Sequence, residues 1–182
     1  WVLDSATVVA NFNFNIMSSD DELITIVCPC GATKLKSDMP PVGAGFCHCR
    51  ACRALTTGVA IEAVLWPEGS HEDASSKSHL KIQSGGLVSR KRPDLQITVH
   101  SCKECNVHMF HTEIHNLDCV GAVDIQRCYP DGIPTSCKST AHHNYGSRVL
   151  DISDNLVKWY DSPAELGGSG KKCNNDGSII EE

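Results

Sequence analysis

Short runs of apolar residues, several of them alternating with polar ones, recur along the chain and predict β-strands. Leu23 to Val27 is rich in β-branched residues, and residues 79–83 and 95–100 alternate between apolar and polar side chains. Further strand candidates lie at residues 59–66, 107–114, 120–125 and 149–152. Helical periodicity is weak, and only residues 50–57, followed by Gly58, are expected to form a short helix. The pattern therefore predicts a mainly β fold with little helix.

The remaining segments indicate a single domain with two flanking pieces. A chain of 182 residues suits one domain with a core of its own. We expect an N-terminal extension over residues 1–20, the domain over residues 21–166 and a flexible, glycine-rich tail over residues 167–182. Because Met17 resembles a natural start, residues 1–16 are interpreted as an upstream extension or a non-native remnant.

Composition and charge exclude several classes of partner. Aromatic residues make up 5% of the chain and the formal charge is −6, so neither a base-stacking surface nor attraction to phosphate backbones is indicated. No apolar run approaches the ~20 residues that a membrane-spanning helix needs. The 11 cysteines are odd in number and clustered, which favours metal binding in a reducing compartment. We expect a cytoplasmic protein without nucleic-acid or membrane partners; its oligomeric state stays open.

Two pairs of cysteines have the spacing of metal ligands. Cys28 and Cys30 follow one predicted strand, and Cys102 and Cys105 follow another. One pair cannot complete a tetrahedral zinc site, so the two pairs are expected to bind one structural zinc ion together and to hold their strands in place. The alternative is that they are unrelated pairs of buried thiols.

A third cluster contains three cysteines within six residues, Cys47, Cys49 and Cys52. Three thiolates leave one coordination position of zinc free for water, a thiol or a carbonyl oxygen, as in catalytic zinc sites. The sequence thus predicts two zinc ions per chain, one structural and one catalytic. The alternative is a second closed site. Candidates for its fourth ligand are His48 and the distant Cys119, Cys128 and Cys137.

Three further side chains are candidates for proton transfer during catalysis. His48 lies between two thiols of the third cluster, while His143 and Tyr145 belong to a later polar stretch. The other polar and thiol residues are interpreted as surface or core groups. They are His100, His108 and His111 beside the Cys102/Cys105 pair, Cys119 as a core thiol and Cys173 as a free thiol in the tail.

The motifs together resemble the glutathione-dependent formaldehyde-activating enzyme family, which includes the centromere-protein-V relatives. The likeness covers about residues 23–170 and is carried by these motifs: Cys28-Pro-Cys30-Gly-Ala, Phe46-Cys-His-Cys-Arg-Ala-Cys-Arg53, Thr57-Gly58, Cys102-Lys-Glu-Cys105 and a closing stretch from Tyr145 to Gly170. The resemblance implies a β-tent fold of small antiparallel sheets. It implies the same division of the seven thiols into a structural and an active-site zinc, and reversible addition of glutathione to formaldehyde.

The chain departs from the family pattern at positions that leave the zinc ligands untouched. Asn106 stands where the family usually has glycine, Ser101 stands where an aromatic residue is common, and the segment 84–94 is longer and more basic than expected. We expect these positions near the pocket, so they bear on the identity of the substrate.

The sequence therefore favours a zinc-dependent carbon–sulfur lyase that acts on a thiol–carbonyl adduct, with glutathione and formaldehyde or a related carbonyl as partners. One alternative is a zinc-dependent dehydratase, a carbon–oxygen lyase that acts on a secondary metabolite without glutathione. A second alternative is a non-enzymatic zinc module that binds a partner.

Overall fold

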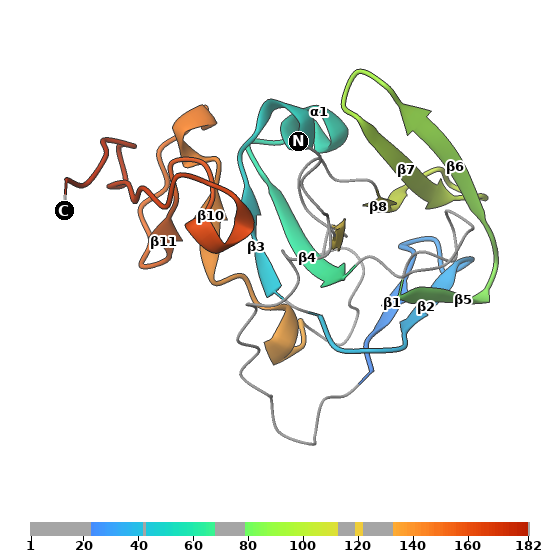
Figure 1. Ribbon diagram of the computed structural model, residues 1–182. Coiled ribbons are helices and arrows are strands. Elements are labelled where there is room, and N and C mark those ends of the chain that lie inside the picture. Colours follow the sequence, from blue (N-terminus) through green and yellow to red (C-terminus); the bar gives the residue numbers. More distant parts are fainter. Residues whose placement is uncertain (1–22, 42, 68–78, 113–118, 122–132, 182) are drawn as a thin grey trace, which may run out of the picture.

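The computed structural model describes residues 23–41, 43–67, 79–112, 119–121 and 133–181, and it is mainly β (Figure 1). This confirms the expected fold class. Within the described residues the single α-helix is α1 (Arg50–Thr56), close to its predicted bounds. The strands are β1 (Thr25–Val27), β2 (Lys34–Ser37), β3 (Gly43–Cys47), β4 (Ile61–Pro67), β5 (Leu80–Ser84), β6 (Leu87–Arg92), β7 (Ile97–Cys102), β8 (His108–Thr112), β9 (Cys119–Gly121), β10 (Ala141–His143) and β11 (Val157–Lys158). Three 3-10 segments complete the list: η2 (Thr135–Cys137), η3 (Tyr145–Ser147) and η4 (Ala164–Leu166).

The strands form two sheets. The smaller sheet has the order β1-β2-β5 and is antiparallel throughout. The larger sheet has the order β11-β10-β3-β4-β9-β8-β7-β6. Its central and β6-side pairs are antiparallel, as expected, but β10 lies parallel to both β3 and β11. Figure 1 shows the small sheet beside the β6–β7 end of the large one, with α1 next to β3.

The main hydrophobic core lies between the sheets. From the small sheet, Ile26 and Leu35 are fully buried, and Lys34 and Lys36 on the alternate positions of β2 are exposed. Trp66 from β4 is also fully buried, and its indole N–H donates to the Met39 carbonyl at 3.1 Å. A second, smaller cluster contains Ile61 and Ala63 and packs against two thiols of the third cysteine cluster.

The path between the sheets depends on a close backbone contact. β5 ends at Ser84 in the small sheet and β6 begins at Leu87 in the large one. Gly85 between them has φ of +74°, and a Cβ atom there would lie 2.1 Å from the Ala32 carbonyl oxygen. Only glycine fits this position. The segment expected as a long basic loop is therefore mostly strand β6.

Three further expectations differ from the structure. Residues 149–152 are not a strand; the late strand is β11, which follows that segment. The polar stretch of His143 and Tyr145, for which no strand is predicted, contains β10. The tail expected to be flexible from residue 167 has backbone contacts through residue 180, including bridges Trp159–Lys172 and Cys173–Ile179, and Cys173 is buried. The predicted N-terminal extension, and the part of the 120–125 strand candidate beyond Gly121, lie outside the described residues.

Candidate metal centres and active site

Four cysteine sulfurs converge where the two sheets meet. Cys28 Sγ lies 3.2 Å from Cys105 Sγ and 3.4 Å from Cys30 Sγ, and Cys30 Sγ lies 3.7 Å from Cys102 Sγ. Zinc–sulfur bonds of about 2.3 Å would place four tetrahedral sulfurs about 3.8 Å apart, so the arrangement is near that of a closed zinc site. The two cysteine pairs thus form one group of four sulfurs that could hold a metal ion.

Two tight turns aim these sulfurs inward. Gly31 has φ of +77° and its N–H donates to the Cys28 carbonyl at 2.7 Å. Asn106 has φ of +59° and its N–H donates to the Cys102 carbonyl at 2.9 Å. Asparagine adopts this left-handed conformation more readily than other residues with a side chain. Its replacement of the family's glycine is thus explained by the turn, and a role at the substrate pocket is not needed to account for it.

The four-thiol site ties the two sheets together. Cys28 follows β1 of the small sheet, and Cys102 is the last residue of β7 of the large sheet. Burial would raise the pKa of Cys102, but the Thr33 hydroxyl, which donates to its sulfur at 3.2 Å, and backbone N–H groups lower that pKa to about 6. Cys28 and Cys102 are buried, while Cys30 and Cys105 are exposed.

The other three cysteines gather at the end of β3 and the start of α1. The sulfurs of Cys47, Cys49 and Cys52 all lie within 4.8 Å of one another. Cys49 is the N-cap of α1, and its sulfur accepts the Cys52 N–H at 3.3 Å. A thiolate is favoured at such a position because the first N–H groups of a helix have no partner within the helix.

Among the described residues, no fourth histidine, cysteine or carboxylate joins this cluster. His48 points away from the sulfurs, and its Nε2 lies 2.9 Å from His142 Nδ1. Cys137 lies in the main core together with residues of the four-thiol site. Cys128 and the side chain of Cys119 lie outside the described part of the chain. Within that part, the cluster is a three-ligand site.

Strand β10 brings two polar side chains to the three-thiol cluster. His143 is the register partner of Cys47 on the neighbouring parallel strand. Its ring lies over Gly45, where a Cβ atom would be 2.9 Å from His143 Cδ2. The Asn144 amide donates to Cys47 Sγ at 3.5 Å. His143 is half-buried, and burial lowers its pKa below the usual range.

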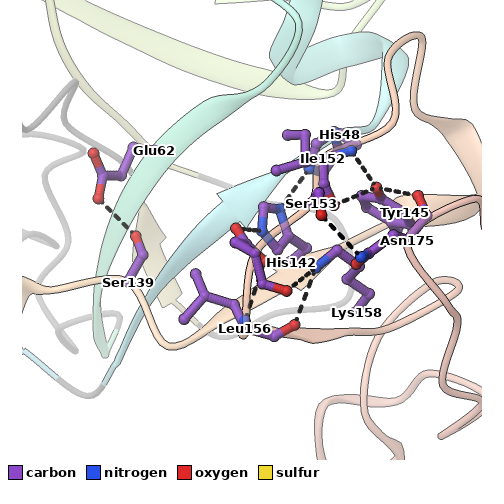
Figure 2. Close-up of polar contacts among 11 residues, drawn as sticks. His48, Glu62, Ser139, His142, Tyr145, Ile152, Ser153, Leu156, Lys158 and Asn175 are labelled. Carbon is purple, nitrogen blue, oxygen red and sulfur yellow. Dashed lines mark hydrogen bonds and ion pairs between the residues drawn. The ribbon is translucent and has the colours of Figure 1, made fainter.

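The other two candidates for proton transfer are held elsewhere. Tyr145 is fully buried; its hydroxyl group donates to the Asn175 carbonyl and accepts the Ile152 N–H, each at 2.7 Å. His48 is also buried and belongs to a chain of polar groups behind the cluster, drawn in Figure 2. Neither side chain is directed at the thiols by any contact in the structure.

Sequence reasoning missed one histidine near the three-thiol cluster. His111 on β8 is buried, and it lies close enough to Cys49 for that thiolate to raise its pKa. Burial dominates, however, and the pKa of His111 is lowered to about 3. Its Nδ1 lies 3.3 Å from His108 Nε2. The position could not be read from the sequence because β8 reaches the cluster only through the pairing of the large sheet.

The geometry agrees with the comparison to known families. The model of the glutathione-dependent formaldehyde-activating enzyme family matches residues 23–142, about two thirds of the chain, and this range contains all seven clustered cysteines. The chain belongs to this family. A search of the curated proteins gives no match. The described part of the glutathione-dependent formaldehyde-activating domain contains no helix with the length and apolar character of a membrane span.

Family membership implies zinc, and the donor atoms of this domain fit it. Thiolates are preferred ligands of zinc. Without a cation the three thiols cannot all ionise: hydrogen bonds from Cys47 and Cys52 lower the pKa of Cys49, while the contact with Cys49 raises the pKa of Cys47. A divalent cation removes this conflict because it binds all three as thiolates. Cys47, Cys49 and Cys52 would hold one ion, and Cys28, Cys30, Cys102 and Cys105 the other.

Proposed function

We propose that this chain is a cytoplasmic, zinc-dependent carbon–sulfur lyase that catalyses the reversible addition of a thiol to a carbonyl compound. The family match supports glutathione and formaldehyde, or a related carbonyl, as the substrate class. The observation that carries the proposal is the three-thiol cluster, which among the described residues lacks a fourth protein ligand. Zinc bound there would supply a thiophilic Lewis acid with one open position.

The reaction needs only two contributions from the protein. In the forward direction the thiol sulfur bonds to the carbonyl carbon, the carbon–oxygen double bond becomes a single bond, and the proton of the thiol ends on the new hydroxyl group. The reverse reaction breaks the carbon–sulfur bond. No oxidant or reductant takes part. The protein must hold the two reactants beside each other and move one proton.

We assign the transfer of this proton to the side chain of His143. Its ring shares a face of the sheet with Cys47 and is half-buried, and within the described residues neither ring nitrogen is hydrogen-bonded to a backbone group. Asn144 fixes the orientation of the Cys47 sulfur through its amide. Burial keeps His143 neutral near pH 7, so that one ring nitrogen can accept the thiol proton and return it to the carbonyl oxygen.

Exchange NMR with glutathione and ¹³C-formaldehyde tests this function. We expect zinc-loaded protein to accelerate the interconversion of formaldehyde hydrate and the S-hydroxymethyl adduct. Cys49→Ala should abolish the acceleration, whereas Cys173→Ala, which removes a buried thiol outside both clusters, should retain it.

The same experiment separates the alternatives. If wild-type protein with two bound zinc ions accelerates no thiol adduct, the lyase function is wrong. Dehydration of a carbinol without any thiol would then favour the dehydratase. Binding of a partner without turnover of any substrate would favour the non-enzymatic zinc module.

A further inference from the structure

A chain of polar side chains runs behind the three-thiol cluster, on the side away from the sulfurs. His48 Nε2 lies 2.9 Å from His142 Nδ1, and His142 Nε2 lies 2.8 Å from Asp154 Oδ2. Lys158 Nζ donates to Asp154 Oδ1 at 2.5 Å. Figure 2 shows the rings of His48 and His142 next to each other, with the Lys158 amine on the far side of His142.

The two histidines and the lysine are buried, and burying them costs free energy, whereas the side chain of Asp154 is 33% exposed. His48 and His142 are each 1% exposed and Lys158 is 3% exposed. A buried ammonium group is tolerated only when it is paired. Burial would raise the pKa of Asp154, but hydrogen bonds from Lys158 and His142 lower it to about 2, so the pairing carboxylate is ionised. An apolar cluster of similar volume would fill the same space without this cost.

The carboxylate of Asp154 determines which nitrogen of His142 donates in this series of hydrogen bonds. An ionised Asp154 can only accept, so His142 carries a proton on Nε2 and donates it. His142 Nδ1 on the other side of the ring is hydrogen-bonded to His48 Nε2. The carboxylate thereby fixes the ring orientation of His142 and, through the hydrogen bond between the rings, that of His48. The same logic applies to histidines that bind metals directly and donate their other nitrogen to a carboxylate.

His48 is the middle residue of the three-residue span that carries two of the ligand thiols. Its N–H donates to the His143 carbonyl at 2.9 Å, and its carbonyl accepts Arg53 Nε at 3.0 Å. Side chains alternate along extended backbone, so fixing His48 on one side fixes Cys47 and Cys49 on the other.

We propose that Asp154, His142 and Lys158 are positioning residues of the three-thiol site, which hold His48 and, through it, the sulfurs of Cys47 and Cys49 in the arrangement that binds the metal ion. The inference rests on the proposed function in so far as the cluster must hold zinc. The family match ends at His142, so Asp154 and Lys158 lie beyond the matched residues. Replacement of such outer residues typically weakens metal affinity about 10- to 100-fold.

The test measures zinc release from the full, zinc-loaded chain to a chromogenic chelator. In His142→Phe the ring and its stacking on Phe46 are kept, but both nitrogens are lost. We expect one zinc equivalent to leave about 10- to 100-fold faster than in wild type, while the four-thiol equivalent, an internal reference in the same molecule, is unchanged. Asp154→Asn should also accelerate the release of this zinc equivalent, but by a smaller factor. Cobalt-loaded variants should show altered visible bands for that site alone.

Asp38→Asn is the matched control, because it removes the carboxylate of another aspartate–histidine pair, Asp38 Oδ1 to His79 Nδ1 at 2.6 Å, away from both clusters. It should release both equivalents at the wild-type rate. If His142→Phe fails to fold, Asp154→Asn with Lys158→Met removes both charges of the ion pair together and should show the same selective loss. Unchanged release from folded variants overturns the positioning role alone. A wild-type protein that holds zinc only in the four-thiol site overturns the proposed function as well.

Discussion

The Tyr145 hydroxyl group is hydrogen-bonded to backbone groups. It accepts the Ile152 N–H and donates to the Asn175 carbonyl, so it links the segment after η3 to the C-terminal segment. We predict that Tyr145→Phe lowers the free energy of unfolding by about 1–3 kcal/mol, because it leaves these backbone groups without a partner. Turnover of the folded protein should stay close to wild type. Urea unfolding and steady-state kinetics on one preparation measure both; a folded, inactive variant would restore Tyr145 as a proton donor.

For His143 we expect the opposite, a large effect on turnover and a small effect on stability. Its ring lies beside the three-thiol cluster on β10, and within the described residues its side chain forms no hydrogen bond. We predict that His143→Gln lowers kcat about 100-fold or more, the usual contribution of a proton-transferring group, with little effect on unfolding. Turnover and zinc content measured together check this. Wild-type kcat in the variant would exclude His143 from proton transfer.

The grouping of the cysteines could be predicted from the sequence, whereas the roles of the residues around them could not. Cysteine spacing alone indicated both thiol clusters, because a pair or a triplet at ligand spacing restricts which sulfurs can converge. The sequence does not distinguish His48, His143 and Tyr145 from one another as candidates for proton transfer. Their roles differ because each has different partners in the fold. The ring of His48, for example, contacts His142, which lies more than 90 residues away along the chain. Such contacts depend on strand pairing and leave no local signal.

Among the secondary-structure elements, the parallel pair β3 and β10 forms the wall of the three-thiol site. Gly45 on β3 faces β10 so closely that a Cβ atom would lie 2.9 Å from both the Ala141 carbonyl oxygen and the ring of His143. Gly43 on the same strand has open space at the Cβ position, with nothing within 4 Å. The two glycines therefore form a matched pair for testing the contact.

We predict that Gly45→Ala displaces β10, lowers the free energy of unfolding by about 1–3 kcal/mol and reduces turnover, because the added methyl group has no space. Gly43→Ala should match wild type in both respects. Unfolding curves and kinetics of the two variants make the comparison. Equal behaviour of Gly45→Ala and Gly43→Ala would contradict the close contact and the role given to the β10 wall.

The elements differ in how far the sequence indicated them. The alternating runs at residues 95–100 and 79–83 lie in β7 and β5, so the pattern indicated both strands. It did not indicate which face is buried: on β5 Leu80 is buried but Ile82 is exposed, and on β7 the polar His100 is buried while Val99 is half-buried. β3 and β10 gave no such signal. β3 is Gly-Ala-Gly-Phe-Cys, and β10 is only three residues long. Both are stabilised by their neighbours in the sheet, which local pattern does not reveal.

At the scale of the whole molecule, the two thiol clusters connect different parts of the fold. The four-thiol site joins strands from both sheets, β1 and β7, while the three-thiol site lies within one sheet at the β3–α1 junction. Metal bound in the first site would therefore contribute to folding directly, because it would close the contact between the sheets. Metal bound in the second site would add little, because it would connect elements that are already adjacent along the chain.

The measurement that tests this division of roles most directly is urea unfolding of zinc-loaded Cys102→Ala and Cys49→Ala, with wild type alongside. We predict that Cys102→Ala loses more than about 4 kcal/mol of stability, as loss of a metal centre does. Cys49→Ala should lose about 1 kcal/mol, the cost of an N-cap, and stay folded but inactive. If Cys49→Ala unfolds at as low a urea concentration as Cys102→Ala, the assignment of a structural and a catalytic site is contradicted.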